Sequence, residues 1–163
     1  VCVSVSTADC IPILIYDRVH HAVAAVHAGW RSTVLRIPEA VLQAMAGAYG
    51  TRPQDVEAAI GPGISLEAFE VGDEVYEAFR TAGFPMEKIA RRYPATGDGS
   101  GRMEKWHLDL WQADRGLLEG CGVPSARIHL AGVCTYLHSE RFFSARRLGI
   151  RSGRILNGIF LTD

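Results

Sequence analysis

Two short apolar runs near the start of the chain place the strongest constraint on its fold. They extend from Ile11 to Tyr16 and from His21 to Val26, and the polar stretch Asp17-Arg18-Val19-His20 separates them. Apolar runs of this length, bounded by a short polar break, are typical of β-strands that pair as a hairpin. We therefore expect an antiparallel hairpin with Arg18-Val19 as a two-residue loop, in which Tyr16 pairs with His21.

This register predicts that Cys10 lies directly opposite His27. Facing side chains on antiparallel strands have Cβ atoms about 4.5–5.5 Å apart. At that distance a thiolate and an imidazole can share one metal ion, or can act as a nucleophile and its base. Two other interpretations stay open, because a buried cysteine and a hydrogen-bonded core histidine are both common in proteins.

The remaining pattern alternates strands and helices. We expect strands over Val1–Val5, Val56–Ile60, Arg127–Val133 and Ile155–Leu161, helices over Thr33–Tyr49, Glu70–Thr81 and His107–Glu119, and a surface loop over Tyr93–Lys105. Pro38 fits the first turn of its helix and Gly50 its end. An antiparallel hairpin among interleaved helices indicates a single α/β (α+β-like) domain over residues 1–163, with helices packed on a mixed sheet. Because the first residues already follow a strand pattern, we expect that a native N-terminal part precedes them.

Composition excludes several classes of function. The net charge of −1 gives no electrostatic footprint for nucleic acid. The chain has no run of about 18 apolar residues and no visible signal peptide, so we expect neither a membrane span nor secretion. Its four cysteines follow no Cys-x-x-Cys spacing, which favours free thiols in a reducing, cytoplasmic setting.

Several weaker motifs have two interpretations each. Gly61-Pro62-Gly63 indicates either a tight turn or a close backbone approach to a ligand. His107 and Asp109 are possible metal ligands, although their spacing favours a helix-start role for Asp109. Phe142-Phe143 is more typical of core packing than of base stacking. Arg146-Arg147 indicates either an anion clamp or a solvated edge.

Taken in order, the motifs resemble one known family over essentially the whole chain. They are Thr7-Ala8-Asp9-Cys10-Ile11-Pro12, His27-Ala28-Gly29-Trp30-Arg31, Gly61-Pro62-Gly63-Ile64, Phe69-Glu70-Val71-Gly72, Cys134-Thr135, Phe142-Phe143-Ser144-Ala145-Arg146-Arg147 and Ser152-Gly153-Arg154. The chain resembles the YfiH-type purine nucleoside phosphorylases, formerly labelled multicopper polyphenol oxidoreductases or laccase-domain proteins. The resemblance implies a layered single-domain sandwich and a zinc-dependent enzyme. Such an enzyme would phosphorolyse adenosine, inosine, guanosine and methylthioadenosine, and would also deaminate adenosine.

The resemblance also implies roles for individual residues. Cys10 and His27 match two zinc ligands, while the family's second histidine ligand would lie upstream of Val1. Three protein ligands leave one zinc position open for water or substrate. Arg31 is the first choice for binding phosphate, and Arg146 or Arg147 the second. Asp9 would orient a ligand, and Phe69 or Phe143 would stack on the purine.

Three alternatives compete with this interpretation. Cys10 and His27 could instead be the nucleophile and base of a cysteine hydrolase. A copper-dependent polyphenol oxidase is less consistent with the sequence, because the chain has six histidines and no His-x-His pair. A non-enzymatic interaction module would need neither a metal nor nucleoside and phosphate as partners.

Overall fold

Four strands form the central sheet, and the rest of the chain is arranged around it. The computed structural model describes residues 1–94, 104–149 and 151–162. Its strands are β1 (Cys2–Thr7), β2 (Ile11–Asp17), β3 (Ala22–Ala28), β4 (Val56–Ile60), β5 (Glu70–Val71), β6 (Ala90–Pro94), β7 (Glu104–Leu108), β8 (Ile128–Leu130) and β9 (Ile155–Phe160). Its α-helices are α1 (Trp30–Val34), α2 (Ile37–Tyr49), α3 (Asp73–Thr81), α4 (Met86–Ile89), α5 (Leu110–Gly120) and α6 (Ala145–Leu148), and short 3₁₀ turns at Pro53–Asp55 and Ser125–Arg127 precede β4 and β8.

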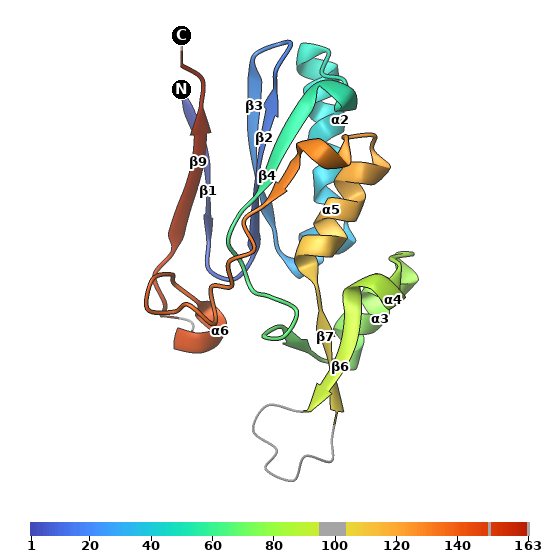
Figure 1. The fold of residues 1–163 in the computed structure, drawn as a ribbon, viewed down its shortest axis with the longest axis vertical. Coiled ribbons are helices and arrows are strands. Elements are labelled where there is room, and N and C mark those ends of the chain that lie inside the picture. Colours follow the sequence, from blue (N-terminus) through green and yellow to red (C-terminus); the bar gives the residue numbers. More distant parts are fainter. Residues whose placement is uncertain (95–103, 150, 163) are drawn as a thin grey trace.

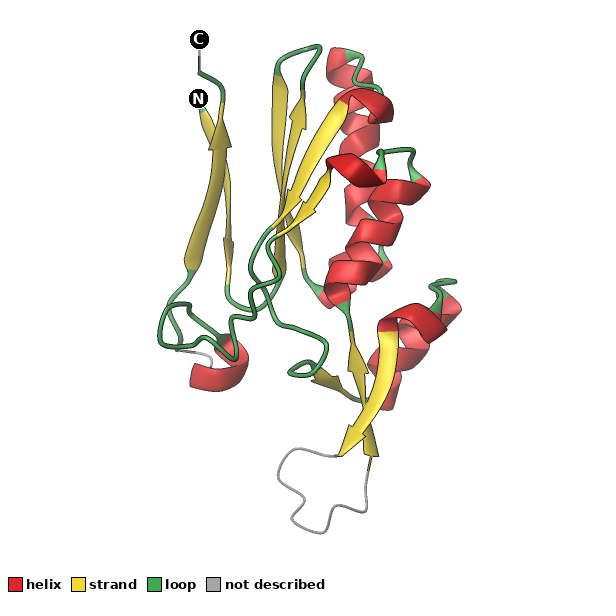
Figure 2. Ribbon diagram, in the orientation of Figure 1, coloured by secondary structure: helices red, strands yellow, loops and turns green. Residues whose placement is uncertain are grey.

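The central sheet has the order β3-β2-β4-β8, in which only β4 and β8 run parallel. Helices α2 and α5 cover one face of it, and the antiparallel pair β1-β9 lies on the other side (Figure 1). A second sheet, β5-β7-β6, lies with α3 and α4 at one end of the molecule (Figure 2). The expected α/β class, with helices packed on a mixed sheet, is confirmed.

Strand periodicity explains where the core forms. Ile11, Ile13 and Ile15 alternate along β2 and are fully buried. They belong to one apolar cluster with Leu42 of α2 and Leu118 of α5. The main core therefore lies between the central sheet and the helices, as an amphipathic strand and helix require. No helix within the described residues is long and apolar enough to cross a membrane.

Two of the expected helices have different bounds in the structure. The expected helix Thr33–Tyr49 is two helices, α1 and α2, because Arg36 between them is left-handed at φ 58°. Pro38 and Gly50 have their expected places at the two ends of α2. Glu70 and Val71 form strand β5, and their helix begins only at Asp73.

The last expected helix and the expected loop also differ from the structure. His107 lies in β7, and α5 begins after Asp109, whose carboxylate accepts a hydrogen bond from the Gln112 N–H at 3.0 Å. The helix-start role of Asp109 is thus confirmed. The ends of the expected loop Tyr93–Lys105 belong to the β6–β7 hairpin, and residues 95–103 lie outside the described part of the chain.

Candidate active site

One end of the central sheet gathers the residues that the sequence singled out. Strands β1, β3, β4 and β8 end there and β2 and β9 begin there, at the lower end of the sheet in Figure 1. Cys10 lies in the link between β1 and β2, and His27 is the penultimate residue of β3. Residues far apart in the chain are therefore neighbours at this end.

The predicted register of the hairpin was wrong by two residues. Tyr16 pairs with Val23 and Pro12 with His27, so continuing the ladder places Cys10 opposite Gly29. The loop has four residues, because the Asp17 carboxylate accepts hydrogen bonds from the backbone N–H groups of Val19 and His20 at 2.9 and 3.0 Å. An aspartate side chain that accepts hydrogen bonds from backbone N–H groups two and three residues later stabilises a longer turn than the expected two-residue loop.

A shift of two residues would keep Cys10 and His27 on the same face of the sheet. They would then be diagonal rather than directly facing neighbours, for which the Cα atoms lie about 7–8 Å apart. The Cys10 side chain lies against Gly29, where a Cβ atom would be only 3.0 Å from Sγ. Glycine at that position therefore leaves room for the thiol. A metal-sharing distance between Cys10 and His27 stays a prediction.

Cys10 is half-buried and His27 is exposed. Burial raises the pKa of the Cys10 thiol, the nearby charge of Asp9 raises it further, and the charge of Arg154 acts in the opposite direction. A cysteine that acts as a nucleophile needs a lowered pKa. The electrostatic environment of Cys10 thus disfavours the cysteine-hydrolase alternative.

The donor types of this pair suit zinc, but the pair is not a complete zinc site. Within the described residues, no three or more histidine, cysteine, aspartate and glutamate side chains form a group that could hold a metal ion. Zinc in enzymes usually has three protein ligands and one open position. Cys10 and His27 fit a zinc ion if a further ligand comes from outside the described residues.

His107 and Asp109 serve other purposes in the structure. The Nδ1 atom of His107 lies 3.0 Å from the backbone oxygen of Leu66, and the side chain is buried in the second sheet. Asp109 caps α5. The possibility that these two residues bind a metal together finds no support.

Asp9 joins four chain segments beside Cys10, and we call these contacts the Asp9 junction. Its Oδ1 accepts a hydrogen bond from the Thr135 hydroxyl and its Oδ2 one from the Arg146 backbone N–H, both at 2.7 Å. Its backbone oxygen accepts one from the Ile64 N–H at 2.8 Å. Asp9 is buried and left-handed, with φ 81°. The junction therefore fixes the backbone that leads directly into Cys10.

The glycine motif after β4 is part of this junction. A Cβ atom on Gly63 would collide with Ile11 Cδ1 and lie 3.0 Å from the Asp9 backbone oxygen. A Cβ on Gly61 would lie 2.8 Å from Pro12 Cγ. A close backbone approach occurs at Gly61 and Gly63, but it is to the chain's own β2 and Asp9, and the expected approach to a ligand stays a prediction.

The predicted phosphate-binding arginines have different surroundings. The Arg31 guanidinium is exposed and lies 4.2 Å from the Trp30 ring centroid. Arg146 donates from Nη1 to the Glu70 backbone oxygen at 2.8 Å, and its guanidinium lies over Phe69. Arg147 lies over Tyr136 at 5.1 Å. Of the three, Arg146 is the most firmly held.

The two predicted stacking residues also differ. Phe69 is 8% exposed and has Arg146 over its ring, whereas Phe143 is 48% exposed. A Cβ on Gly153 would lie 2.7 Å from the Phe143 ring, so this glycine allows the ring to pack against the chain before β9. Phe143 is the more accessible of the two, although a stacking role for either stays a prediction.

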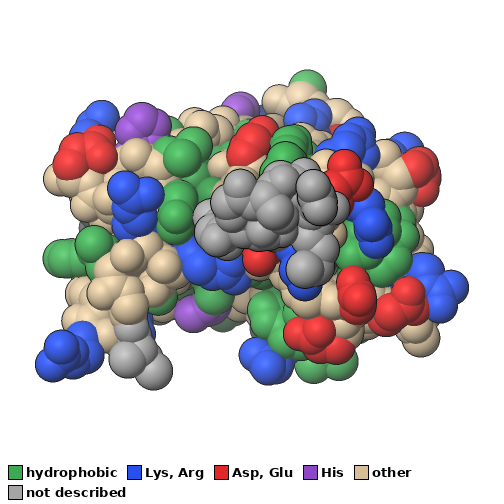
Figure 3. Space-filling model, turned by 90° about the horizontal axis from the view of Figure 1, so that it is seen from below, with side chains coloured by type: hydrophobic (Ala, Val, Ile, Leu, Met, Phe, Trp, Pro, Cys, Tyr) green, Lys and Arg blue, Asp and Glu red, His purple; other side chains and the backbone are tan. Residues whose placement is uncertain are grey.

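Arg154 is a residue to which the sequence assigned no role. Thr7 pairs with Ile155, so Arg154 precedes β9 at the same end of the sheet as Asp9 and Cys10. Its charge acts on the Cys10 thiol. The motif Ser152-Gly153-Arg154 directly before a strand was the feature of the sequence that could have indicated Arg154 as a site residue. Figure 3, which views the molecule from this end, shows acidic side chains mainly on the side of α3 and α4 and basic side chains on both sides.

The chain is similar to known proteins over nearly its whole length. The family model described as "Multi-copper polyphenol oxidoreductase laccase" matches residues 1–162. A Bacteroides thetaiotaomicron protein named purine nucleoside phosphorylase is 53% identical over 98% of this chain and 57% of its own length. A protein named adenosine deaminase RL5, from an unknown prokaryotic organism, is 46% identical over 97% of this chain and 57% of its own length.

Solved structures show the same relationship. The crystal structure of a Bacillus licheniformis hypothetical protein YfiH matches with a TM-score of 0.86 at 30% identity, and covers 99% of this chain and 58% of that one. A Neisseria meningitidis protein matches with a TM-score of 0.80 at 38% identity over 99% of this chain and 61% of that one. The chain thus spans little more than half the length of these relatives.

Proposed function

Because this chain belongs to the YfiH-type family, described as multi-copper polyphenol oxidoreductase laccase proteins, we propose that it carries the Cys10–His27 part of a purine nucleoside phosphorylase. Two relatives at 53% and 46% identity are named for purine nucleoside chemistry, which favours this activity over oxidation of phenols. What supports the proposal is that Cys10 and His27 lie at the same end of the central sheet, beside a backbone that the Asp9 junction holds in place.

The proposed enzyme cleaves the bond between ribose C1′ and purine N9. An oxygen of inorganic phosphate forms a bond to C1′, and the purine leaves with the electron pair and takes up a proton. We assign binding of the phosphate to Arg31, whose guanidinium is exposed, and a second positive charge near the site to Arg154. Phe143, with its exposed ring, is assigned to the purine.

Cys10 and His27 would hold zinc together with a third ligand from a segment that this chain does not include. Bound zinc supplies a Lewis acid and lowers the pKa of a bound water, which suits deamination of adenosine. The relative named adenosine deaminase RL5 favours this second activity. Adenosine, inosine, guanosine and methylthioadenosine are the proposed substrates.

Phosphate dependence tests the proposal. Release of hypoxanthine from inosine is measured in the natural full-length protein at increasing phosphate concentration. We expect no hypoxanthine without phosphate, and a higher apparent phosphate constant in Arg31→Ala with unchanged zinc content. Arg18→Ala, an exposed arginine in the β2–β3 loop at the opposite end of the sheet, serves as the matched control. Hypoxanthine release independent of phosphate would exclude phosphorolysis.

The assignment of Arg31 has its own test within the same titration. If Arg31 only braces the Trp30 ring, Arg31→Ala will lower stability slightly and leave the phosphate constant unchanged. That result would remove Arg31 from the proposed site without affecting the proposed reaction.

A further inference from the structure

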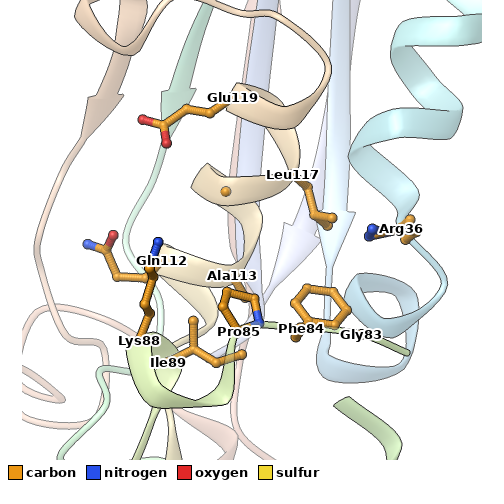
Figure 4. Close-up of a pocket in the computed structure, with 11 residues that line it drawn as sticks. Arg36, Gly83, Phe84, Pro85, Lys88, Ile89, Gln112, Ala113, Leu117 and Glu119 are labelled. Carbon is orange, nitrogen blue, oxygen red and sulfur yellow. The ribbon is translucent and has the colours of Figure 1, made fainter. Parts of the chain in front are cut away.

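A hollow lies on the side of α5 that faces α4, and the residues that line it include neither Cys10 nor His27. Its volume is about 320 Å³, within the range of small-molecule pockets. Residues that line it include Arg36, Phe84, Pro85, Lys88, Gly116 and Leu117 (Figure 4). They come from the link between α1 and α2, the link between α3 and α4, and the helices α4 and α5. We call this hollow the α5 pocket.

Gly116 leaves part of the pocket wall without a side chain. It lies inside α5, and a Cβ atom on it would meet no heavy atom within 4 Å. Packing therefore does not require glycine there, although glycine in a helix interior costs about 1 kcal/mol relative to alanine. Because Gly116 lines the pocket, the missing side chain makes the pocket deeper.

Arg36 is a second unusual residue of the pocket. Its φ of 58° and ψ of 41° are left-handed, a conformation that costs an ordinary residue about 1–2 kcal/mol. Strained residues of this kind cluster at ligand sites. The Arg36 guanidinium lies 5.6 Å from the Phe84 ring centroid, and its Nε atom is 3.5 Å from Glu39 Oε1. That long contact leaves most of its donors available to a ligand.

The charges around the pocket favour an anion. Lys88 is exposed and, among the described residues, its ammonium forms no ion pair. Glu119 also lines the pocket, but its Oε1 is engaged by Arg115 Nε at 3.0 Å and by the Ser125 hydroxyl at 2.8 Å. The Glu119 carboxylate is therefore already paired, whereas Lys88 has no ion pair among the described residues and Arg36 has only its long contact with Glu39.

Between the two cations the pocket is apolar. In Figure 4, Arg36 and Lys88 stand on opposite sides, with Phe84 and Pro85 between them and Leu117 on the adjoining turn of α5. A flat apolar group fits against Phe84 and Pro85, and a carboxylate at its end can pair with the planar guanidinium of Arg36.

We propose that the α5 pocket binds a small aryl carboxylate, with its ring against Phe84 and Pro85 and its carboxylate on Arg36. Lys88 adds a second positive charge on the opposite side. This site is separate from Cys10 and His27 and goes beyond the nucleoside activity. Its test therefore does not depend on whether the phosphorylase proposal is correct.

The test uses the ¹⁵N-labelled natural full-length protein and 4-phenylbutyrate as the probe. The amide signals of Gly83 and Gly116 lie at the pocket and report on binding. We expect both signals to shift and saturate with 4-phenylbutyrate, and the uncharged 4-phenylbutanamide to bind about tenfold more weakly, since a charge-assisted hydrogen bond is lost.

Three variants locate the site. Gly116→Leu should fill the pocket and abolish binding, while Gly47→Leu, at an exposed α2 glycine whose Cβ also meets no atom, should bind as the wild type does. Arg36→Asn removes the cation but tolerates the left-handed backbone, and should weaken binding about tenfold. Non-saturating shifts, equal affinity for the amide, or unchanged binding by Gly116→Leu would each overturn the proposal.

Discussion

Replacement of Asp9 should destabilise the protein and alter Cys10 at the same time. In Asp9→Ala, the Thr135 hydroxyl and the Arg146 N–H lose their acceptor, and Thr135 is fully buried. A hydrogen bond to a charged group contributes about 1.5–3 kcal/mol, so the two together give a loss of about 3–6 kcal/mol. A typical domain has only about 5–15 kcal/mol of stability, which makes this a large fraction.

Asp9→Asn should have a smaller effect on stability. Its amide oxygen can still accept a hydrogen bond from Thr135, and asparagine tolerates the left-handed backbone. The amide NH₂ would face the Arg146 N–H, so one of the two hydrogen bonds is lost, at about 1.5–3 kcal/mol. Urea unfolding at pH 7 measures both variants.

The second readout is the reactivity of Cys10. The charge of Asp9 raises the pKa of the Cys10 thiol, so Asp9→Asn should lower that pKa and speed alkylation of Cys10 by iodoacetamide near pH 8. Peptide mapping distinguishes Cys10 from the other cysteines. Asp17→Asn is the matched control, because Asp17 is a buried, loop-capping carboxylate at the far end of β2.

Two results would refute this reasoning. Asp9→Ala within about 0.5 kcal/mol of wild type, the range of ordinary surface substitutions, would mean that the junction does not hold the fold. Equal effects of Asp9→Asn and Asp17→Asn on the alkylation rate of Cys10 would mean that Asp9 has no specific influence on the thiol.

The remaining predictions concern buried acids and one glycine. Burial would raise the pKa of Asp17, but hydrogen bonds, including those from His20, lower it below its ordinary value. The stabilisation that the Asp17 carboxylate gives to the fold is therefore present above about pH 4 and is lost as the pH falls below that. The urea midpoints of Asp17→Asn and wild type should converge in acid. Burial raises the pKa of Asp114 well above its ordinary value despite a hydrogen bond from Thr33, so the stability of the wild type should decline as the pH rises from about 4. Asp114→Asn should flatten that decline. Parallel curves of stability against pH for the two proteins would contradict this. Gly63→Ala should lower the free energy of unfolding by about 1–3 kcal/mol because the added Cβ has no room, whereas the control Gly47→Ala should raise it by about 0.4–1 kcal/mol. An unchanged free energy of unfolding in Gly63→Ala would mean that the backbone can move away.

The β2–β3 hairpin shows which features of the structure the local sequence pattern can predict. Its strands and their core-facing residues follow from the alternation of apolar residues, and this part of the prediction was confirmed. The register was not, because one side chain, Asp17, sets the width of the loop through hydrogen bonds with Val19 and His20. Cys10 and His27 nevertheless lie at the same end of the central sheet, and their common face, which a shift of two residues would preserve, stays a prediction.

The Asp9 junction could not be predicted from the sequence. Asp9 is separated from Thr135 by 126 residues and from Arg146 by 137. No periodicity in the chain indicates which distant hydroxyl or amide a carboxylate will meet. Likewise, the break between α1 and α2 rests on the left-handed backbone of Arg36, a residue type that gives no local warning of it.

The most direct test of the account is the zinc content of the natural full-length protein, measured together with its phosphorolysis of inosine. We predict stoichiometric zinc and phosphate-dependent release of hypoxanthine, both lost in Cys10→Ala and in His27→Ala. Both should persist in Cys121→Ala and His20→Ala, which change the same residue types after α5 and in the β2–β3 loop, away from the site. Full zinc content and full activity in Cys10→Ala or His27→Ala would contradict the account.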